Sequence, residues 1–124
     1  MRSISSILLA LMTESEKFTS FIDDELNRVG NLFDEKHQQY STSLDPLSNF
    51  RTGAMLEHHD DSYDMMYEVA KGYLNKHIAF IYDHGIVDKT EESLRDMVVY
   101  GLIMLYMTKK HKEWLAQVKG EADE

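Results

Sequence analysis

The spacing of apolar residues in the first third of the chain constrains its fold most strongly. Between residues 13 and 40 an apolar side chain recurs every three or four positions, at Phe18, Phe21, Ile22, Leu26, Val29 and Phe33. This spacing puts all of them on one face of an amphipathic helix. In the TESE sequence that precedes them, Thr13 and Glu16 match a capping box. The pattern therefore predicts a long helix over residues 13–40.

Two later segments have the same character. Residues 61–84 begin with acidic and hydroxyl side chains, which favour a helix start, and are followed by Gly85, a residue typical of helix ends. Residues 90–118 begin with a threonine and two glutamates. The chain has one proline, and alternating strand patterns are almost absent. We therefore predict an all-α fold: a single domain over 1–124, forming an antiparallel helical bundle of three main helices plus short helices, with an acidic tail over 119–124.

The charge of the chain excludes several kinds of partner. Twenty-two acidic residues stand against 13 basic ones, which gives a formal charge of −9. This disfavours direct binding to nucleic acid or to an anionic membrane, because both need a basic surface. It leaves open a metal-bound small ligand or a basic protein surface. We also expect a homodimer or a higher homo-oligomer, because an exposed part of the methionine-rich apolar set would suit such an interface.

The absence of cysteine and of a long apolar segment favours the cytoplasm. A chain without cysteine has no disulfide, no thiolate zinc site and no thiol nucleophile. The apolar run within residues 1–12 is too short for a secretory signal, and a membrane span needs about 20 apolar residues. We expect residues 1–12 to form a short amphipathic helix, with association as a secondary use.

The last predicted helix carries acidic residues within apolar sequence. Glu92 and Asp96 are four residues apart and share a helix face with Tyr100, one turn further on. Two carboxylates on one face, meeting acids of a neighbouring helix, form the kind of oxygen site that magnesium prefers. The simpler interpretation is a solvated helix start, because acidic residues are favoured in a first turn. Asp96 lies past that turn, so for this residue the two interpretations are balanced.

The preceding helix carries a second polar strip. Lys76 and Asp83 are seven residues apart on one face, and His77 lies one step round the helix from Lys76. Lys76 or His77 could pair with Asp96 across the helices, or could bind a phosphate. A buried charge without a partner would cost several kcal/mol, so these residues are either paired or exposed. A hydrogen-bonded structural histidine is the alternative for His77.

Acidic residues also follow the start of the middle helix. Asp61, Asp64 and Glu68 have the spacing of one helix face, and with the two acids of the last helix they would form a carboxylate cage. A solvated face explains them equally well. The EHHDD string over residues 57–61 has the composition of a metal site. Its adjacent histidines point in different directions, which favours a solvated loop.

Three phrases of the sequence resemble a known family in their order and spacing. They are LDPLSNF at 44–50, with Lys36 and Tyr40 before it, KHIAFIYD at 76–83 and ESLRDMVVY at 92–100. Together they resemble small phage-encoded helical proteins of the nucleotide-modification-associated type. Those proteins are distantly similar to the MazG-like all-α nucleoside-triphosphate pyrophosphohydrolases. The resemblance covers roughly residues 30–108.

This resemblance implies a four-helix-type fold, often dimeric, that holds magnesium on helix carboxylates and acts on nucleotide phosphates. Glu92 and Asp96 match the second acidic motif of that superfamily. At the first motif, E-x-x-E, the chain has Glu68 but Lys71, so the motif is incomplete. The sequence therefore leaves open whether any reaction is catalysed, and Lys76 and neighbouring His77 could instead hold a phosphate without hydrolysis.

Three hypotheses for function follow. The first is a phage-type protein that binds or hydrolyses a nucleoside phosphate in a polar pocket between helices. Its candidate residues have three roles: catalytic, Glu92 and Asp96; ligand-binding, Lys76, His77, Asp83 and Tyr100; and magnesium-binding, Glu68, Glu92 and Asp96. The second is an acidic phage protein that acts in the host cytoplasm and inhibits a host defence or nucleic-acid-binding protein through its surface charge. The third is a structural or assembly protein in which buried pairs set the helix register.

Overall fold

The computed structural model describes residues 3–40 and 45–123, which form five α-helices and no strand. The helices are α1 (Ile4–Leu11), α2 (Glu14–Tyr40), α3 (Ser48–His58), α4 (Tyr63–His84) and α5 (Thr90–Asp123). The prediction of an all-α fold is confirmed. Within the described part of the chain, no helix has both the length and the apolar character needed to cross a membrane.

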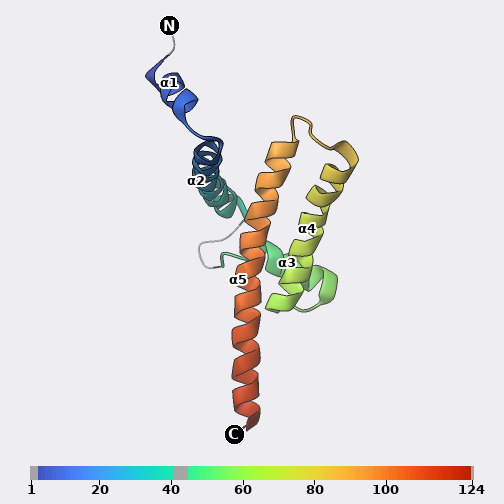
Figure 1. Cartoon of the computed structure of the whole chain (residues 1–124). Coiled ribbons are helices and arrows are strands. Elements are labelled where there is room, and N and C mark those ends of the chain that lie inside the picture. Colours follow the sequence, from blue (N-terminus) through green and yellow to red (C-terminus); the bar gives the residue numbers. More distant parts are fainter. Residues whose placement is uncertain (1–2, 41–44, 124) are drawn as a thin grey trace.

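An antiparallel pair of helices, α4 and α5, forms the framework of the molecule (Figure 1). A short turn over residues 85–89 connects them at one end. Helix α3 packs against α4, and α2 lies beside the first half of α5. In Figure 1, α1 and the start of α2 stand away from this framework, whereas the C-terminal part of α5 extends beyond α3 and α4 in the opposite direction.

The core lies where α3, α4 and the middle of α5 meet. Its fully buried residues are Ala54, Met66, Ala70 and Met107, and the cluster is completed by Leu47, Phe50, Val69 and Met104. Flexible methionine side chains fill the irregular gaps between helices that cross. A Cβ added at Gly53 would lie 3.0 Å from Cγ1 of Val69, so this glycine lets α3 approach α4 closely.

The predicted capping box before α2 and the predicted stop at Gly85 occur in the structure, whereas α4 begins at Tyr63 rather than at residue 61 and its N-cap Ser62 makes no capping hydrogen bond with its side chain. Before α2, the Glu16 N–H donates to Thr13 Oγ1 (3.1 Å) and the Thr13 N–H donates to Glu16 Oε1 (3.3 Å), which is the predicted capping box. Gly85 ends α4 with a positive φ of 64°. Thr90 Oγ1 donates to the Gly85 carbonyl (2.6 Å) and accepts from the Val87 N–H (2.9 Å). Thr90 therefore closes the turn between α4 and α5.

The end of the last helix differs from the prediction. The sequence places this end at residue 118 and an acidic tail over 119–124, but α5 continues to Asp123. Only residue 124 of that tail lies outside the described residues. Glutamate and alanine, both good helix formers, follow the glycine at position 120 and offset its cost of about 1 kcal/mol.

The connection after α2 is also shorter than predicted. The turn-forming residues and the single proline within 41–49 predict a loop over that range, whereas α3 already begins at Ser48. Residues 41–44 of this loop lie outside the described residues. At the other end of the chain, the helix expected within residues 1–12 is α1, although residues 1–2 are not described. Helix α1 buries none of its residues.

Candidate functional site

Two of the predicted polar residues meet between α4 and α5. Asp96 is only 5% exposed, and its Oδ2 lies 3.6 Å from Nε2 of His77, which is ion-pair distance when the imidazole is protonated. One turn beyond Asp96, the ring of Tyr100 lies 5.9 Å from the His77 ring. A polar pair therefore links the two helices, as expected for a buried carboxylate that needs a partner.

Aromatic side chains from three helices form a continuous row next to this pair. Tyr73 of α4 stacks on Tyr100 with ring centres 5.9 Å apart, and Phe50 of α3 meets these two rings edge-on at 5.9 and 6.5 Å. Offset and edge-to-face contacts are the favoured arrangements of aromatic rings. Lys76 joins the row through Tyr73, with its Nζ 5.4 Å from the ring centre. Lys76 and Tyr100 thus both contact Tyr73, and His77 contacts Tyr100.

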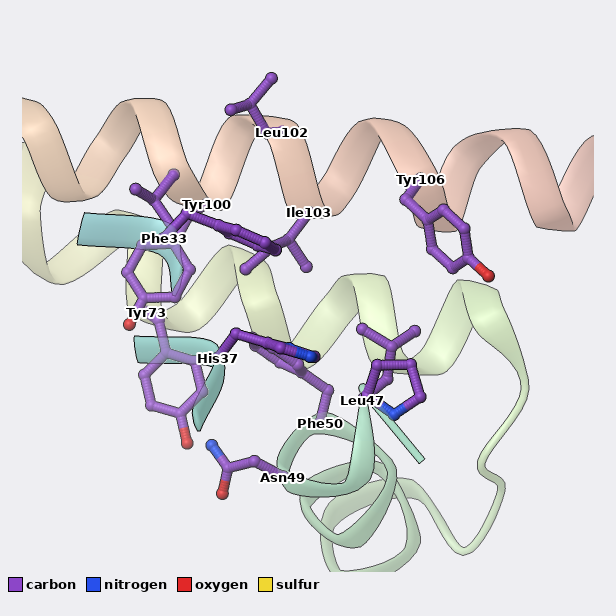
Figure 2. Close-up of a pocket in the computed structure, with 12 residues that line it drawn as sticks. Phe33, His37, Leu47, Asn49, Phe50, Tyr73, Tyr100, Leu102, Ile103 and Tyr106 are labelled. Carbon is purple, nitrogen blue, oxygen red and sulfur yellow. The ribbon is translucent and has the colours of Figure 1, made fainter. Parts of the chain in front are cut away.

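A cavity of about 630 Å³ opens beside this aromatic row (Figure 2). Helices α2, α3, α4 and α5 all contribute to its wall, so it forms only when segments far apart in the sequence assemble. Most of the wall is apolar or aromatic, and its polar groups are an amide, an imidazole and tyrosine hydroxyls. The lining residues are Phe33, His37, Pro46, Leu47, Asn49, Phe50, Tyr73, Val99, Tyr100, Leu102, Ile103 and Tyr106.

Helix α2 closes one side of the cavity and is held to α5 by an ion pair. Arg95 donates from Nε to Glu25 Oε2 (2.9 Å) and from Nη2 to Glu25 Oε1 (3.1 Å). These hydrogen bonds lower the pKa of Glu25 and raise the pKa of Arg95. About two turns further along α2, Phe33 stacks on His37 with ring centres 5.6 Å apart, and both residues line the cavity.

The other predicted site residues do not join this group. Asp83 and Glu92 are exposed. Glu68 is also exposed and forms an ion pair with Lys71, its Oε2 lying 2.9 Å from Nζ. It lies nine residues, or about 13 Å along α4, from the histidine that meets Asp96. Glu68 therefore lies apart from Glu92 and Asp96, the other two predicted magnesium ligands. Across residues 3–40 and 45–123, no three histidine, aspartate or glutamate side chains assemble to hold a metal ion.

The EHHDD string forms the end of α3 and the loop to α4. His59 ends α3 with a positive φ of 56°. Arg51 donates from Nε to Asp45 Oδ2 at 2.7 Å, and its Nη1 lies 3.5 Å from Oδ2 of Asp61. The hydrogen bond from Arg51 lowers the pKa of Asp45. Arg51 thus ties this loop to the segment before α3.

Most of the cavity wall has no distinguishing signal in the sequence. Phe33 is one of six apolar residues on a helix face, and nothing separates it from its neighbours. Asn49 and Phe50 stand out only within the LDPLSNF phrase. A usable signal exists on α5, where Tyr100, Ile103 and Tyr106 follow at three-residue intervals on one side of the helix.

Comparison of the chain with models of protein families, with curated proteins and with solved structures gives no match. The resemblance to phage-encoded and MazG-like proteins therefore stays a prediction. The candidate site has to be interpreted from its own geometry, which is an aromatic cavity beside the pair of buried Asp96 and partly buried His77.

Proposed function

We propose that this protein binds a small planar ligand of the nucleotide class in the cavity between α2, α3, α4 and α5. The wall of the cavity carries this proposal, because aromatic rings surround a space of about 630 Å³. Pockets for small ligands commonly have this size and are mostly apolar, with a few polar groups that orient the ligand. A nucleobase suits such a wall, since stacking on aromatic side chains contributes about 1–3 kcal/mol per base.

Polar groups at the cavity orient the bound ligand. The amide of Asn49 both donates and accepts hydrogen bonds, and His37 adds an imidazole, so the edge of a base finds matching groups. Lys76, beside the cavity residue Tyr73, supplies a cation for a phosphate attached to the base. Its position supports the ligand-binding role predicted for Lys76, while Tyr100 takes part as an aromatic wall.

The geometry favours binding over hydrolysis. The predicted hydrolysis needs its two catalytic carboxylates, Glu92 and Asp96, within hydrogen-bond reach of the reacting group. Asp96 is buried against His77, Glu92 is exposed, and neither acid is among the described residues that line the cavity. Hydrolysis with magnesium therefore remains a separate prediction, which the same experiment tests.

A thermal-shift screen of the purified protein against nucleosides and nucleotides, with and without magnesium, tests the proposal. A ligand that binds only the folded state stabilises it by about 2.7 kcal/mol at 100 times its Kd, so the melting temperature rises. Phosphate or pyrophosphate release, measured in parallel, reports hydrolysis. We expect a rise that does not need magnesium, without product. If no nucleotide or nucleoside raises the melting temperature, the proposal is wrong.

Two matched pairs of variants locate the binding. Asn49→Ala removes an amide at the cavity, and Asn75→Ala removes an exposed amide of α4 outside it. Lys76→Ala removes the cation beside Tyr73, and Lys89→Ala removes an exposed cation of the α4–α5 turn. We expect the first member of each pair to weaken binding and the second to leave it unchanged. Lys76→Ala should affect nucleotides but not nucleosides, because only nucleotides carry a phosphate.

A second candidate function is assembly, which is favoured by the apolar surface that a single chain leaves exposed. Helix α1 buries no residue, and the first half of α2 exposes Phe18, Phe21, Ile22 and Leu26. Contiguous exposed apolar surface commonly marks an interaction site. In this proposal the predicted antiparallel bundle is complete only when another chain covers these helices.

The hypothesis of an acidic inhibitor of a host protein rests on the charge of α2. Asp23, Asp24, Asp34 and Glu35 are exposed on this helix and would meet a basic partner surface. Such charge complementarity accelerates association and makes it sensitive to salt. Co-purification from a host lysate at low salt, followed by loss of the partner from an Asp23→Lys, Asp24→Lys variant, would support this alternative.

A further inference from the structure

Two segments of the chain leave apolar helix faces uncovered at opposite ends of the molecule (Figure 1). We name residues 14–28 of α2 the acidic arm and residues 109–120 of α5 the basic arm. On the acidic arm, Phe18, Phe21 and Leu26 are 66%, 59% and 63% exposed. They continue the face on which Val29 is buried against the rest of the molecule. The acidic arm thus extends a packed helix face into solvent.

The basic arm, at the other end of the molecule, also extends a packed helix face into solvent. Trp114 and Val118 lie seven and eleven residues beyond Met107, which puts them on the helix face that enters the core. Both are exposed, as is every residue from Lys112 to Glu121. Helix α4 begins at Tyr63, close to Tyr106 and to the first residues of the basic arm, and it does not reach Lys112 or the residues beyond it. The core-facing stripe of α5 therefore continues without a neighbour among the described helices.

The two arms carry opposite charge. The acidic arm has five acidic residues against two basic ones, whereas the basic arm has four lysines against one glutamate. Four of the 13 lysine and arginine residues of the chain thus lie within the 12 residues of the basic arm. An apolar stripe with acidic flanks and an apolar stripe with basic flanks complement each other in both hydrophobic and electrostatic terms.

The face of α5 between the arms is apolar as well. Residues at three- and four-residue intervals are 48% to 66% exposed; they are Leu94, Val98, Leu102 and Leu105, of which Leu102 also borders the cavity. These side chains share one helix face. Apolar surface therefore extends over α5 from near the acidic arm towards the basic arm.

We propose that a second copy of this chain covers these surfaces, in a two-fold dimer in which each basic arm packs on the acidic arm of the other copy. A two-fold axis across α5 turns the C-terminal end of one copy towards the N-terminal end of the other, so both contacts form at once and the assembly closes. The lengths are comparable, since the acidic arm of 15 residues is about 22 Å long and the basic arm of 12 residues about 18 Å. The proposal needs no ligand in the cavity, although the covered face shares Leu102 with the cavity wall.

Reciprocal charge reversal tests this arrangement. One variant carries Lys112→Glu and Lys119→Glu, so both of its arms are acidic. The other carries Asp23→Lys and Asp24→Lys, so its α2 arm loses its acidic excess and opposes another basic arm. All four residues are exposed. Lys89→Glu and Asp88→Lys, in the exposed α4–α5 turn, serve as matched controls. Sedimentation and light scattering report the mass of each protein and of an equimolar mixture of the two variants.

We expect the wild type and both controls to have twice the mass of the 14.5 kDa chain, each arm variant to be monomeric at the same concentration, and the mixture to recover the dimer. A wild type that is monomeric at every concentration overturns the proposal, and so does a dimer that persists in both arm variants. Separate monomers that fail to associate on mixing also overturn it, because reversed arms should still complement each other.

The single tryptophan gives a second measurement that needs no variant. Trp114 lies on the basic arm and is 53% exposed in one chain, so its fluorescence reports whether this arm is covered. With increasing concentration we expect its emission to shift to shorter wavelength as the dimer forms. The Asp23→Lys, Asp24→Lys variant should abolish this shift although it leaves Trp114 unchanged. A dimer that forms with no change in Trp114 emission places the interface elsewhere and contradicts the proposal.

Discussion

Helix α5 passes from a buried region to an exposed one without a change in its sequence pattern. In its middle, Met104 and Met107 are 8% and 0% exposed, whereas Trp114 and Val118, further along the same face, are 53% and 41% exposed. The difference lies in the neighbouring helix. Helix α4 begins opposite the middle of α5 and runs from there towards the start of α5, so it leaves the C-terminal part of α5 uncovered. Helical periodicity thus predicts which face needs a partner, but not whether the partner belongs to the same chain.

The largest effect should be the difference between truncating a buried and an exposed side chain on the same face of α5. We expect Met107→Ala to lower the free energy of unfolding by about 2–5 kcal/mol, because it leaves a cavity in the core. Val118→Ala should change it by less than about 0.5 kcal/mol, as an exposed position does. Urea denaturation at low protein concentration and high salt measures both values for the single chain. Equal losses would mean that the end of α5 is covered within one chain.

A smaller effect on stability should distinguish Asp96 from Glu92, two acidic residues one turn apart on α5. Asp96→Ala removes the partner of His77 inside the α4–α5 pair, and we expect a loss of about 1–3 kcal/mol. Glu92→Ala removes an exposed carboxylate, and we expect a change below about 0.5 kcal/mol. Urea denaturation again measures both. An Asp96→Ala protein that keeps its stability but loses nucleotide binding would assign Asp96 to function rather than to packing.

The smallest effect concerns the ion pair at the boundary between the covered and uncovered halves of α2. Hydrogen bonds from Arg95 hold the pKa of Glu25 below its ordinary value of 4.5. The pair therefore stabilises the fold above about pH 4.5, and this contribution is lost as the pH falls through the lower pKa of the folded state. We expect Glu25→Gln to melt slightly below the wild type near neutral pH and at the same temperature in strong acid.

Melting curves of both proteins over this pH range provide the measurement, with Asp24→Asn as a control for the loss of one exposed negative charge on the same helix. If the difference in melting temperature between Glu25→Gln and the wild type grew as the pH falls, the pH dependence would be the opposite of the expected one. That result would contradict the ion pair between Glu25 and Arg95. The same reasoning applies to Asp45, whose pKa the hydrogen bond from Arg51 holds below 3.8.

Local signals explain how much of the fold could be predicted. The capping box at Thr13 and Glu16 and the stop at Gly85 depend on neighbours in sequence, so the sequence contains them fully. The end of α5 could not be predicted as reliably, because a glycine near a helix end is compatible with both stopping and continuing. Helix α3 is one of the short helices that the sequence predicts beside the three main ones, and it spans Ser48–His58.

The candidate site was less accessible from the sequence, for a physical reason. Charged residues within apolar sequence are conspicuous. They predicted that Lys76 or His77 pairs with Asp96 across the helices, and the structure has His77 in that position. They also suggested a magnesium site with Glu68, which the structure places about 13 Å from the histidine along α4. The cavity wall consists of ordinary aromatic residues such as Phe33 and Tyr106, whose convergence depends on how four helices pack.

Calorimetric titration of the tightest-binding nucleotide into two matched tyrosine variants tests the central claim, that the aromatic cavity is the ligand site. Tyr106 lines the cavity, whereas Tyr82 is 86% exposed on α4 and lies outside it. We predict that Tyr106→Ala weakens binding about tenfold or more, which corresponds to at least about 1.4 kcal/mol, and that Tyr82→Ala leaves the affinity unchanged. Wild-type affinity in Tyr106→Ala, or an equal loss in both variants, would contradict the account.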